Sequence, residues 1–291
     1  MEFLISSIAQ GFLWSILSLG LFISFRVLNI ADMTTEGSFT LGGAIAVTFI
    51  VSDFNPFLTL VFAFFAGAIS GLFTSLLINY CKIPSLLAGI LTMTGLLSIN
   101  LRIMGKPNIS LLNNKSVFSI FENINLPKNY DVVFLGLLML FIIISLIVTF
   151  FKTEVGQDII ATGDNEDMAK SFGISTKLMI SFGLMISNGL IALSGGILVQ
   201  YQGFSDINSG IGTIVIALAA IIIGEVLFKD VSFTLRLICI VIGSIVYRIL
   251  LLFVIQFNIA SPNDFKLISA LLIIVFLSLP TINKSIRNRG V

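Results

Sequence analysis

The sequence predicts an all-α, polytopic transmembrane helical bundle of about 8–10 spans, and composition is the first reason. Hydrophobic residues make up 57% of the 291 residues and charged residues only 11%, with a mean hydropathy of +1.09. A soluble domain of this length needs a much larger share of polar residues. The second reason is that runs of about 20 apolar residues, long enough to cross a hydrocarbon layer of roughly 30 Å, recur along the chain.

Nine apolar segments follow one another between polar breaks. They are residues 3–25, 39–52, 57–78, 86–101, 131–151, 178–199, 211–228, 233–255 and 266–282. The segments at 39–52 and 86–101 are short for a full crossing, so each is expected to be tilted, half-spanning or part of a broken helix. No basic residue precedes the first run, which is also too long for a cleaved signal peptide, so we interpret it as a retained span. Gly67 with Gly71, and the glycine pair at 195–196, predict close helix packing.

The positions of the basic residues predict which loops face the cytoplasm. The tail at 284–291 carries three of them, and alternation of the spans then places 229–232, 152–177, 79–85 and 26–38 on the same side. Nine basic residues fall on this predicted cytoplasmic side: Arg26, Lys82, Lys152, Lys170, Lys177, Lys229, Lys284, Arg287 and Arg289. Five fall on the other side: Arg102, Lys106, Lys115, Lys128 and Lys266.

The segment GQDIIATGDNEDMAKSFGIS, Gly156 to Ser175, interrupts the apolar sequence with four acidic residues and three glycines. We expect two short helices here. Gly163 is expected to end the first because glycine accepts the left-handed conformation of a helix C-terminus. Asp164 is expected to cap the second helix, and Gly173 to end it.

Within this segment, Met168 and Phe172 are four residues apart and therefore share one helix face. The alternative is a solvated loop that lies on the bilayer surface. An acidic segment suits neither anionic lipid nor a basic amphipathic anchor. We therefore favour a small folded projection whose apolar pair fits a groove on another protein.

Two polar, glycine-rich stretches lie between apolar runs, LNIADMTTEGSFTLGG at 28–43 and QYQGFSDINSGIG at 200–212. Corresponding interruptions in two halves of a chain indicate an inverted repeat with the transport path at the repeat interface. We place these halves at about 1–130 and 131–283 of a single transmembrane domain that covers 1–291. Ordinary turns between helices are an equally supported alternative.

Arg248 lies fifteen residues into the predicted span 233–255, about 22 Å from its cytoplasmic end, so its charge cannot reach the cytoplasm. A buried ion pair and a position on a substrate path, where it would meet a carboxylate, are equally supported. Arg236 is three residues into the same span and can extend to the interface. Glu225 is expected to pair with Lys229 at i,i+4 spacing.

Several activities are excluded by residues that the sequence lacks. There is no histidine, which removes histidine-based catalysis, histidine metal sites and histidine proton relays. No GxxxxGK[ST] motif occurs, so the chain does not hydrolyse ATP through a P-loop. Cys81 and Cys239 are expected to be packing residues rather than a disulfide. The net charge of +1 points to no nucleic-acid partner, and we predict no catalytic, cofactor or metal site on this chain.

Five stretches carry a resemblance to a known family: NIADMTTEGSFTLG at 29–42, LSGGILVQYQGFSD at 193–206, GIGTIVIALAAIIIGE at 210–225, Tyr247-Arg248 and PNDFKL at 262–267. They resemble the permease subunits of bacterial ABC importers of the branched-chain amino acid and ribose type, most closely the subgroup associated with tryptophan and related amino acids. The resemblance covers essentially the whole chain. Met33 and Thr35 differ from the residues expected beside Asp32, and the loop at 102–130 carries no family signal.

This resemblance implies that the segment 152–177 is a cytoplasmic coupling helix that docks on a separate ATPase subunit, which would hold ATP and Mg²⁺. The coupling residues in this segment would be Gly163, Asp164, Met168, Phe172 and Gly173. The resemblance also implies a second copy of the permease, two ATPase copies and an extracytoplasmic substrate-binding lipoprotein, at a bacterial cytoplasmic membrane and its lipid.

The favoured function is therefore import of an amino acid by alternating access, with an aromatic one such as tryptophan as the leading candidate. The residues expected to line the path are Asn29, Asp32, Thr35, Glu36, Gln200, Tyr201, Asp206 and Arg248. The alternative is an ion-gradient-coupled secondary transporter or channel, with Asp32 and Glu36 as cation or proton sites. A non-transporting membrane scaffold is a third class, and polar groups inside the membrane argue against it.

Overall fold

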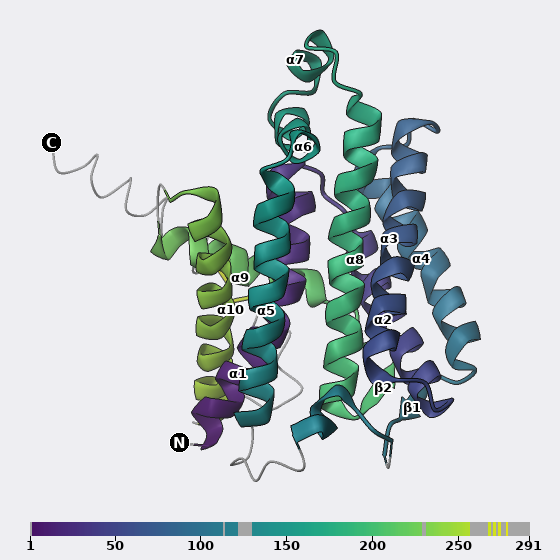
Figure 1. The fold of residues 1–291 in the computed structure, drawn as a ribbon, viewed down its shortest axis with the longest axis vertical. Helices are drawn as coiled ribbons and strands as arrows, with labels where there is room; N and C mark the ends of the chain where they lie inside the picture. The colour runs from purple at the N-terminus through teal and green to yellow at the C-terminus, as the bar shows by residue number, and fades with distance from the viewer. Residues whose placement is uncertain are drawn as a thin grey trace, which may run out of the picture.

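A computed structural model describes residues 2–112, 114–121, 130–228 and 231–256, with scattered residues between 267 and 278. This part of the chain is a bundle of long helices (Figure 1). The helices are α1 (Glu2–Phe22), continued by a π-helical turn η1 (Ile23–Val27), α2 (Thr34–Val51), α3 (Pro56–Asn79), α4 (Ser85–Met104), α5 (Tyr130–Phe151), α6 (Glu154–Asp164), α7 (Glu166–Ser171), α8 (Thr176–Gln202), α9 (Thr213–Leu227) and α10 (Phe233–Gln256). Two short strands, β1 (Asn108–Ser110) and β2 (Phe204–Asp206), pair antiparallel, and a 3₁₀ helix η2 spans Val117–Phe121.

Seven of the described helices are long and apolar enough to cross a membrane, namely α1 with η1, α2, α3, α4, α5, α8 and α10. The predicted multi-pass α-helical fold is therefore confirmed. The segments at 39–52 and 86–101, which were predicted to be short, belong to helices of 18 and 20 residues that are long enough to cross a membrane. The segment at 211–228 is a helix of only 15 residues. The segment at 266–282 lies largely outside the described residues.

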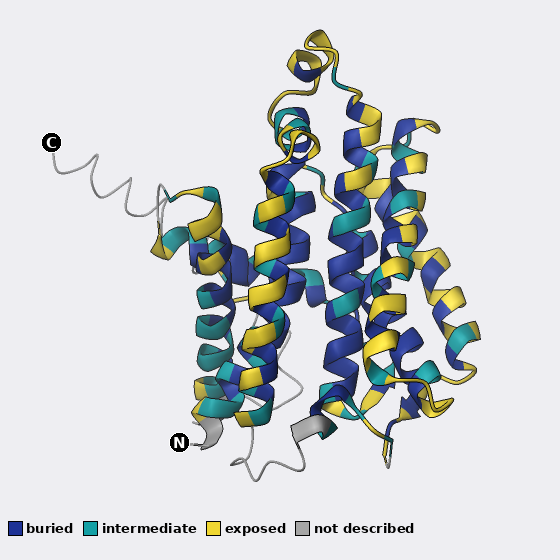
Figure 2. Ribbon diagram, viewed as in Figure 1, coloured by how far each residue is buried: buried dark blue, intermediate teal, exposed yellow. Residues whose placement is uncertain are grey.

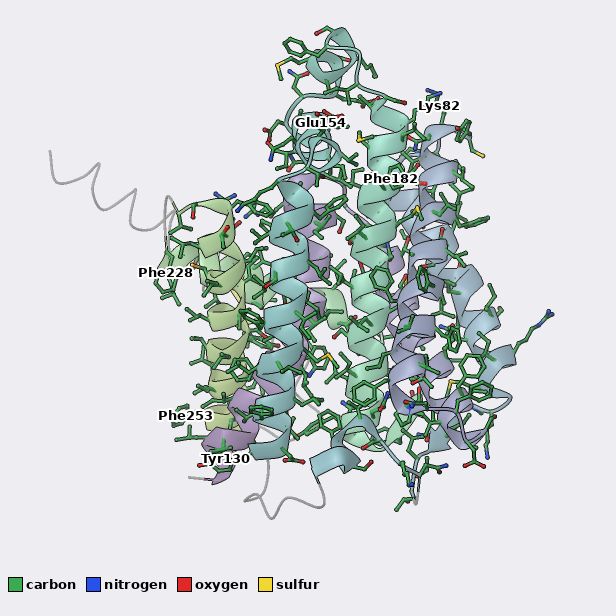
Figure 3. All side chains as sticks on the ribbon, in the orientation of Figure 1. Lys82, Tyr130, Glu154, Phe182, Phe228 and Phe253 are labelled. Atoms are coloured by element: carbon green, nitrogen blue, oxygen red, sulfur yellow. The ribbon has the colours of Figure 1, made fainter. Side chains whose placement is uncertain are left out.

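The bundle has two ends, which Figure 1 shows at the top and bottom. The end that carries α6 and α7 is here named the α7 end, and the end that carries β1, β2 and the start of α1 is named the sheet end. Lys82 and Glu154 lie at the α7 end, and Tyr130 and Phe253 lie at the sheet end (Figure 3). The loops at 79–85 and 152–177, both predicted to be cytoplasmic, therefore share one end of the molecule.

Burial divides the helices into a central and an outer set (Figure 2). In the apolar stretches of α1 and α8, 78% of residues are buried, against 39% in α3, 28% in α4 and 33% in α5. Large apolar side chains such as Phe65 and Ile69 on α3 and Phe141 on α5 are exposed. Lipid tails are as apolar as these side chains, so a bilayer can cover such a surface without a protein partner.

Backbones of α2, α3 and α8 touch directly because glycines leave room for them. A Cβ atom at any of four glycines would overlap a carbonyl oxygen of a neighbouring helix: Gly42 on Ala192, Gly67 on Asn188, Gly71 on Leu184 and Gly195 on Phe39. The prediction of close packing at Gly67, Gly71 and Gly195 is confirmed. These contacts fix α2 and α3 to one another through α8.

Each of the two polar stretches follows a long helix, and these two long helices run in opposite directions through the bundle. The long helix α1 runs from the sheet end to the α7 end, and after a break the chain returns as α2. The long helix α8 runs the opposite way, and after a break the chain returns as α9. In addition, α8 packs mainly on α3 and α2, and α1 packs mainly on α10 and α8. The two helix–break–helix arrangements run in opposite directions, as an inverted repeat requires, and the halves at 1–130 and 131–283 stay a prediction.

Candidate functional site

The first polar stretch turns the chain back into the bundle. After η1, Asn29 adopts a positive φ of 54°, and the next helix begins at Thr34. Asp32 is only 1% exposed. Its Oδ1 accepts a hydrogen bond from the backbone N–H of Thr34 at 2.9 Å, and its Oδ2 accepts one from Nδ2 of Asn188 at 2.7 Å. Because Asn188 is well along α8, α2 begins about 18 Å from the start of α8.

A chain of buried hydroxyl and amide groups extends from Asp32. The Ser38 hydroxyl donates to Oδ1 of Asn188 at 2.7 Å and lies 2.7 Å from the hydroxyl of Ser70 on α3. The Thr34 hydroxyl lies 2.7 Å from that of Thr74, which lies 3.0 Å from that of Thr92 on α4. This polar network joins α2, α3, α4 and α8. In an apolar bundle each such group needs a partner, so the network specifies how these four helices meet.

The second polar stretch enters the bundle from the sheet end and meets the first. Gly212 precedes α9 with a φ of 87°, and its backbone N–H donates to Oε1 of Glu36 at 2.8 Å. The N–H of Gly210 donates to the Thr40 hydroxyl at 3.1 Å. A Cβ at Gly210 would overlap the carbonyl oxygen of Glu36, so the two chain segments touch directly. The start of α9 and the first turns of α2 are thus in contact inside the molecule.

Five other residues predicted to line a path lie in different places. Thr35 is buried, and its hydroxyl donates to the carbonyl of Asp32 at 2.9 Å. Gln200 is buried near the sheet end, where its Oε1 accepts from the N–H of Val117 at 2.8 Å. Asp206 lies in β2 and accepts from the N–H of Asn208 at 2.7 Å. Asn29 lies at the α7 end, and Tyr201 belongs to a separate cluster.

That cluster surrounds Arg248. The guanidinium of Arg248 lies over the ring of Trp14, 4.2 Å from its centroid. Its Nη1 is 3.5 Å from Oε1 of Gln10, whose Nε2 is 3.5 Å from the hydroxyl of Tyr201. Among the described residues no acidic side chain pairs with Arg248. The structure therefore does not bring the predicted path residues together into one site.

A different arginine forms an ion pair between two helices, with both side chains partly exposed. Arg26 in η1 pairs with Glu225 in α9. The predicted pairing of Glu225 with Lys229 is not tested, because Lys229 lies outside the described residues. Arg236 is exposed near the start of α10, as expected for a side chain that reaches the interface. The Arg26–Glu225 pair connects the ends of the two helices that flank the inverted breaks.

The segment 152–177 forms two short helices as predicted, but two of the predicted signals are wrong. The first helix ends at Asp164 and not at Gly163, and Asn165 rather than Asp164 caps the second. The side chain of Asn165 accepts from the N–H of Met168 at 3.0 Å. Asn165 has an extended backbone with φ of −157°, so it is the residue that separates the two helices. Gly173 ends the second helix with a φ of 83°, as predicted.

The second of these helices, α7, projects beyond the other helices at its end of the bundle (Figure 1). Met168 is 46% exposed and Phe172 76% exposed. A hydrogen bond from Lys170 lowers the pKa of Glu166 below its usual value, and the same bond raises the pKa of Lys170. The Thr176 hydroxyl also donates to Glu166, at 3.2 Å. These contacts order α7 while its apolar pair remains uncovered.

The segment 152–177 is also joined to the first break. Nδ2 of Asn29 donates to the carbonyl oxygen of Gly163 at 2.9 Å. A Cβ at Gly163 would overlap the carbonyl oxygen of Val27, and the Cα of Leu28 is next to the same site. Gly163 is therefore needed for close approach between α6 and the chain that leads into α2, rather than for a helix C-terminus.

Several residues of the site escaped sequence reasoning. Asn188, Ser70, Thr74 and Thr92 are uncharged, and each is surrounded in sequence by apolar residues. The one available signal was an amide in the middle of a long apolar run, as in ISNG around Asn188. Its partner could not be identified, because Asp32 is 156 positions away.

Residues 3–277 match the family described as the permease component of branched-chain amino acid transport systems. A tyrosine transport system permease protein of Clostridioides difficile (strain R20291) is 40% identical over 287 residues, covering 99% of this chain and 94% of that protein. An uncharacterised protein of Rickettsia prowazekii (strain Madrid E) is 35% identical over 98% of this chain and 99% of its own length.

Two more distant similarities agree with these. The autoinducer 2 import system permease protein LsrC of Yersinia enterocolitica is 26% identical over 175 residues, covering 60% of this chain and 47% of that protein. Among solved structures, PsaBC from Streptococcus pneumoniae in complex with Fab aligns with a TM-score of 0.51 at 17% identity, covering 94% of this chain and 89% of that one. This structural likeness shows a shared helical fold.

Proposed function

Because this chain belongs to the family of permease components of branched-chain amino acid transport systems, we propose that it drives uptake of an aromatic amino acid in an ATP-powered importer. The proposed cargo follows from the relative in Clostridioides difficile, whose name assigns it to tyrosine transport. The proposed energy source is ATP that is bound with Mg²⁺ and hydrolysed on a separate ATPase subunit.

The observation that supports docking of a separate ATPase subunit is the exposed apolar pair on α7. Phe172 and Met168 are large apolar side chains at an end of the bundle where the loops are polar. A bilayer covers the sides of the bundle and leaves its ends in water, so this pair calls for a protein groove. We assign that groove to the ATPase subunit, with Gly163, Asp164 and Gly173 shaping the segment that docks.

The assembly proposed around this chain contains a second copy of it and two ATPase copies at the α7 end, in a bacterial cytoplasmic membrane. A substrate-binding lipoprotein delivers the amino acid to the sheet end. Within the chain, residues 1–130 and 131–283 act as inverted halves of one domain. The halves meet where Glu36 accepts the N–H of Gly212, and relative movement at this contact would open the path to one side and then the other.

Movement of the ATPase subunit can be transmitted to the contact between Glu36 and Gly212 through α6. A shift of α6 acts on Asn29 through its hydrogen bond to Gly163. The chain then continues within a few residues to Asp32 and the start of α2. This short connection supports transmission from the coupling segment to the break inside the membrane.

The proposal is tested with Met168→Arg and Phe172→Arg in a strain that also expresses the ATPase and the binding protein. Loss of a central apolar side chain costs about 2 kcal/mol or more of binding free energy, roughly a 30-fold weaker contact. We expect the ATPase to stop co-purifying with the permease and uptake of tyrosine to fall. Leu112→Arg is the control, because Leu112 is an apolar side chain that is 79% exposed at the sheet end.

Two results would contradict the proposal. One is unchanged ATPase co-purification and uptake in both α7 variants. The other is uptake that continues after ATP is depleted and stops when the proton gradient is collapsed, which would assign the chain to the secondary transporters.

A further inference from the structure

The guanidinium of Arg248 keeps one complete edge without a partner. Nε and Nη2 are both buried, and neither has a hydrogen-bond acceptor in the described part of the chain. Nη1 has only Oε1 of Gln10, at 3.5 Å, which is long for a hydrogen bond. The N–H groups on Nε and Nη2 point along parallel directions and form the fork that binds both oxygens of a carboxylate. The vacant edge of Arg248 therefore has the shape of a carboxylate receptor.

The described surroundings of Arg248 explain its position but leave its charge largely uncompensated. The ring of Trp14 covers one face of the guanidinium at 4.2 Å in a cation–π contact. This contact does not replace the hydrogen bonds to water that a buried ion loses. Buried N–H groups without acceptors are uncommon in folded proteins, and a buried charge inside a bundle marks a functional site. An anionic ligand would supply the partner that the described residues do not.

The same cluster supplies aromatic surface beside the vacant edge. Trp14 stacks on Phe39, with ring centroids 5.8 Å apart. Tyr201 meets Phe118 edge to face, with centroids 6.0 Å apart. Aromatic rings around a carboxylate-binding edge suit a ligand that carries an aromatic ring next to a carboxylate. The Gln10 amide oxygen and the Tyr201 hydroxyl are acceptors for the ammonium of the same ligand.

The position of the cluster along the bundle agrees with entry of substrate from the sheet end. Gln10 is eight residues from the start of α1, about 12 Å along the helix from that end. Tyr201 is next to the last residue of α8, which ends there too. Arg248 reaches the same level from α10. A substrate delivered to the sheet end would meet this cluster before it meets Glu36 and Asp32.

We infer that Arg248, with Gln10, Trp14 and Tyr201, forms an outer recognition site that binds the α-carboxylate of an aromatic amino acid through Nε and Nη2. The inference rests on the proposed function and deepens it, because it assigns the cargo a first binding site within the permease. Arg248 acts as the selectivity residue for the carboxylate, and the Trp14 ring is close enough to contact the ligand.

Trp14 also provides the measurement, because it is the only tryptophan in the chain. The purified full-length permease is titrated with L-tyrosine, and Trp14 fluorescence is excited at a wavelength that tyrosine does not absorb. We expect a saturable change with L-tyrosine. Tyramine, which has the same ring and ammonium but no carboxylate, is expected to bind at least about 10-fold more weakly, since a charge-assisted hydrogen bond contributes about 1.5–3 kcal/mol.

Variants separate Arg248 from the rest of the helix. In Arg248→Gln the response to L-tyrosine should be lost, and Arg248→Lys should weaken it roughly 10-fold because an ammonium cannot bind both oxygens as a fork. Arg236→Gln, the same substitution at an exposed arginine of α10, should leave the response unchanged. If Arg248→Gln does not fold, the comparison of L-tyrosine with tyramine on the unaltered protein still decides the question.

Two outcomes would overturn the inference: no fluorescence response of the unaltered protein to L-tyrosine, or equal affinities for L-tyrosine and tyramine. Both leave the proposed function standing if ATP-driven tyrosine uptake by the complete importer is still observed. Conversely, absence of that uptake for every aromatic amino acid, with an intact fluorescence response, would contradict the proposed function while the binding site remains.

Discussion

Asp32 shows how a single buried residue determines the arrangement of its neighbours. Its two carboxylate oxygens accept from the Thr34 N–H and from Asn188, and Asn188 also accepts from Ser38. Asp32, Glu36 and Arg248 were identifiable from the sequence, because an ionisable group in an apolar run is costly and therefore conspicuous. Asn188 was not, because an uncharged amide carries no comparable signal.

At this scale we predict that Asn188→Leu destabilises the protein. The substitution leaves the Asp32 carboxylate with one donor fewer and the Ser38 hydroxyl without its acceptor, at a cost of about 2 kcal/mol or more. The thermal unfolding midpoint of the purified protein in detergent should fall accordingly.

Asn100→Leu on α4 is the matched control for this prediction. Asn100 is also buried, but its Oδ1 has no hydrogen-bond partner in the described residues and its Nδ2 makes one bond of 3.3 Å. Leucine has a similar volume and removes the unsatisfied oxygen, so the midpoint should change little. An equal fall in the unfolding midpoint of the two variants would show that the Asp32–Asn188 hydrogen bond does not stabilise the protein more than the Asn100 contact does.

Helix ends were harder to predict than helices. The apolar run at 211–228 suggested a span, but α9 begins only at Thr213, because the residues before it fold against Glu36 and Thr40. The polar residues at 200–212 located this break, but hydropathy could not show that its glycines fold against α2 instead of forming an ordinary turn between helices. Similarly, Asp164 and Asn165 are both good capping residues, and only the backbone shows that Asn165 is used.

At the scale of elements we predict that Gly42→Ala disrupts the contact between α2 and α8. Its Cβ would overlap the backbone of Ala192, which cannot move as a flexible side chain can. The two helices must separate, so we expect lower abundance in the membrane and a lower unfolding midpoint.

Gly95→Ala is the corresponding control in α4, where a Cβ would meet nothing within 4 Å. Alanine favours a helix over glycine by up to about 1 kcal/mol, so this variant should be as stable as the original protein or slightly more so. A Gly42→Ala variant with normal abundance and stability would mean that the two backbones are farther apart than described.

For the whole molecule, the positions of the basic residues and the course of the chain lead to the same orientation. Lys82 lies at the α7 end (Figure 3), and Lys170 and Lys177 belong to or follow α7. The bundle and its projecting segment were thus predictable, because each depends on the order and spacing of apolar runs. The meeting of the two breaks was not, because it joins residues far apart in sequence.

The natural cysteines test this orientation. Cys81 is exposed between α3 and α4 at the α7 end, and Cys239 is buried. We predict that a membrane-impermeant maleimide does not label Cys81 in intact cells and does label it once the membrane is opened. Leu112→Cys in a Cys81→Ser background places a thiol at the sheet end and should be labelled in intact cells. The reverse pattern would invert the assigned topology.

The bond between Asp32 and Asn188 also has a consequence for biosynthesis. The ribosome makes the two residues 156 positions apart, an interval of roughly 8–30 s at about 5–20 residues per second. During this time α2 is already made, but the amide that binds its carboxylate is not. We therefore expect nascent α2 to stay beside the insertion machinery, shielded from lipid, until α8 emerges. Chains stopped before residue 188 should be captured there by cross-linking from α2, whereas longer chains should be released.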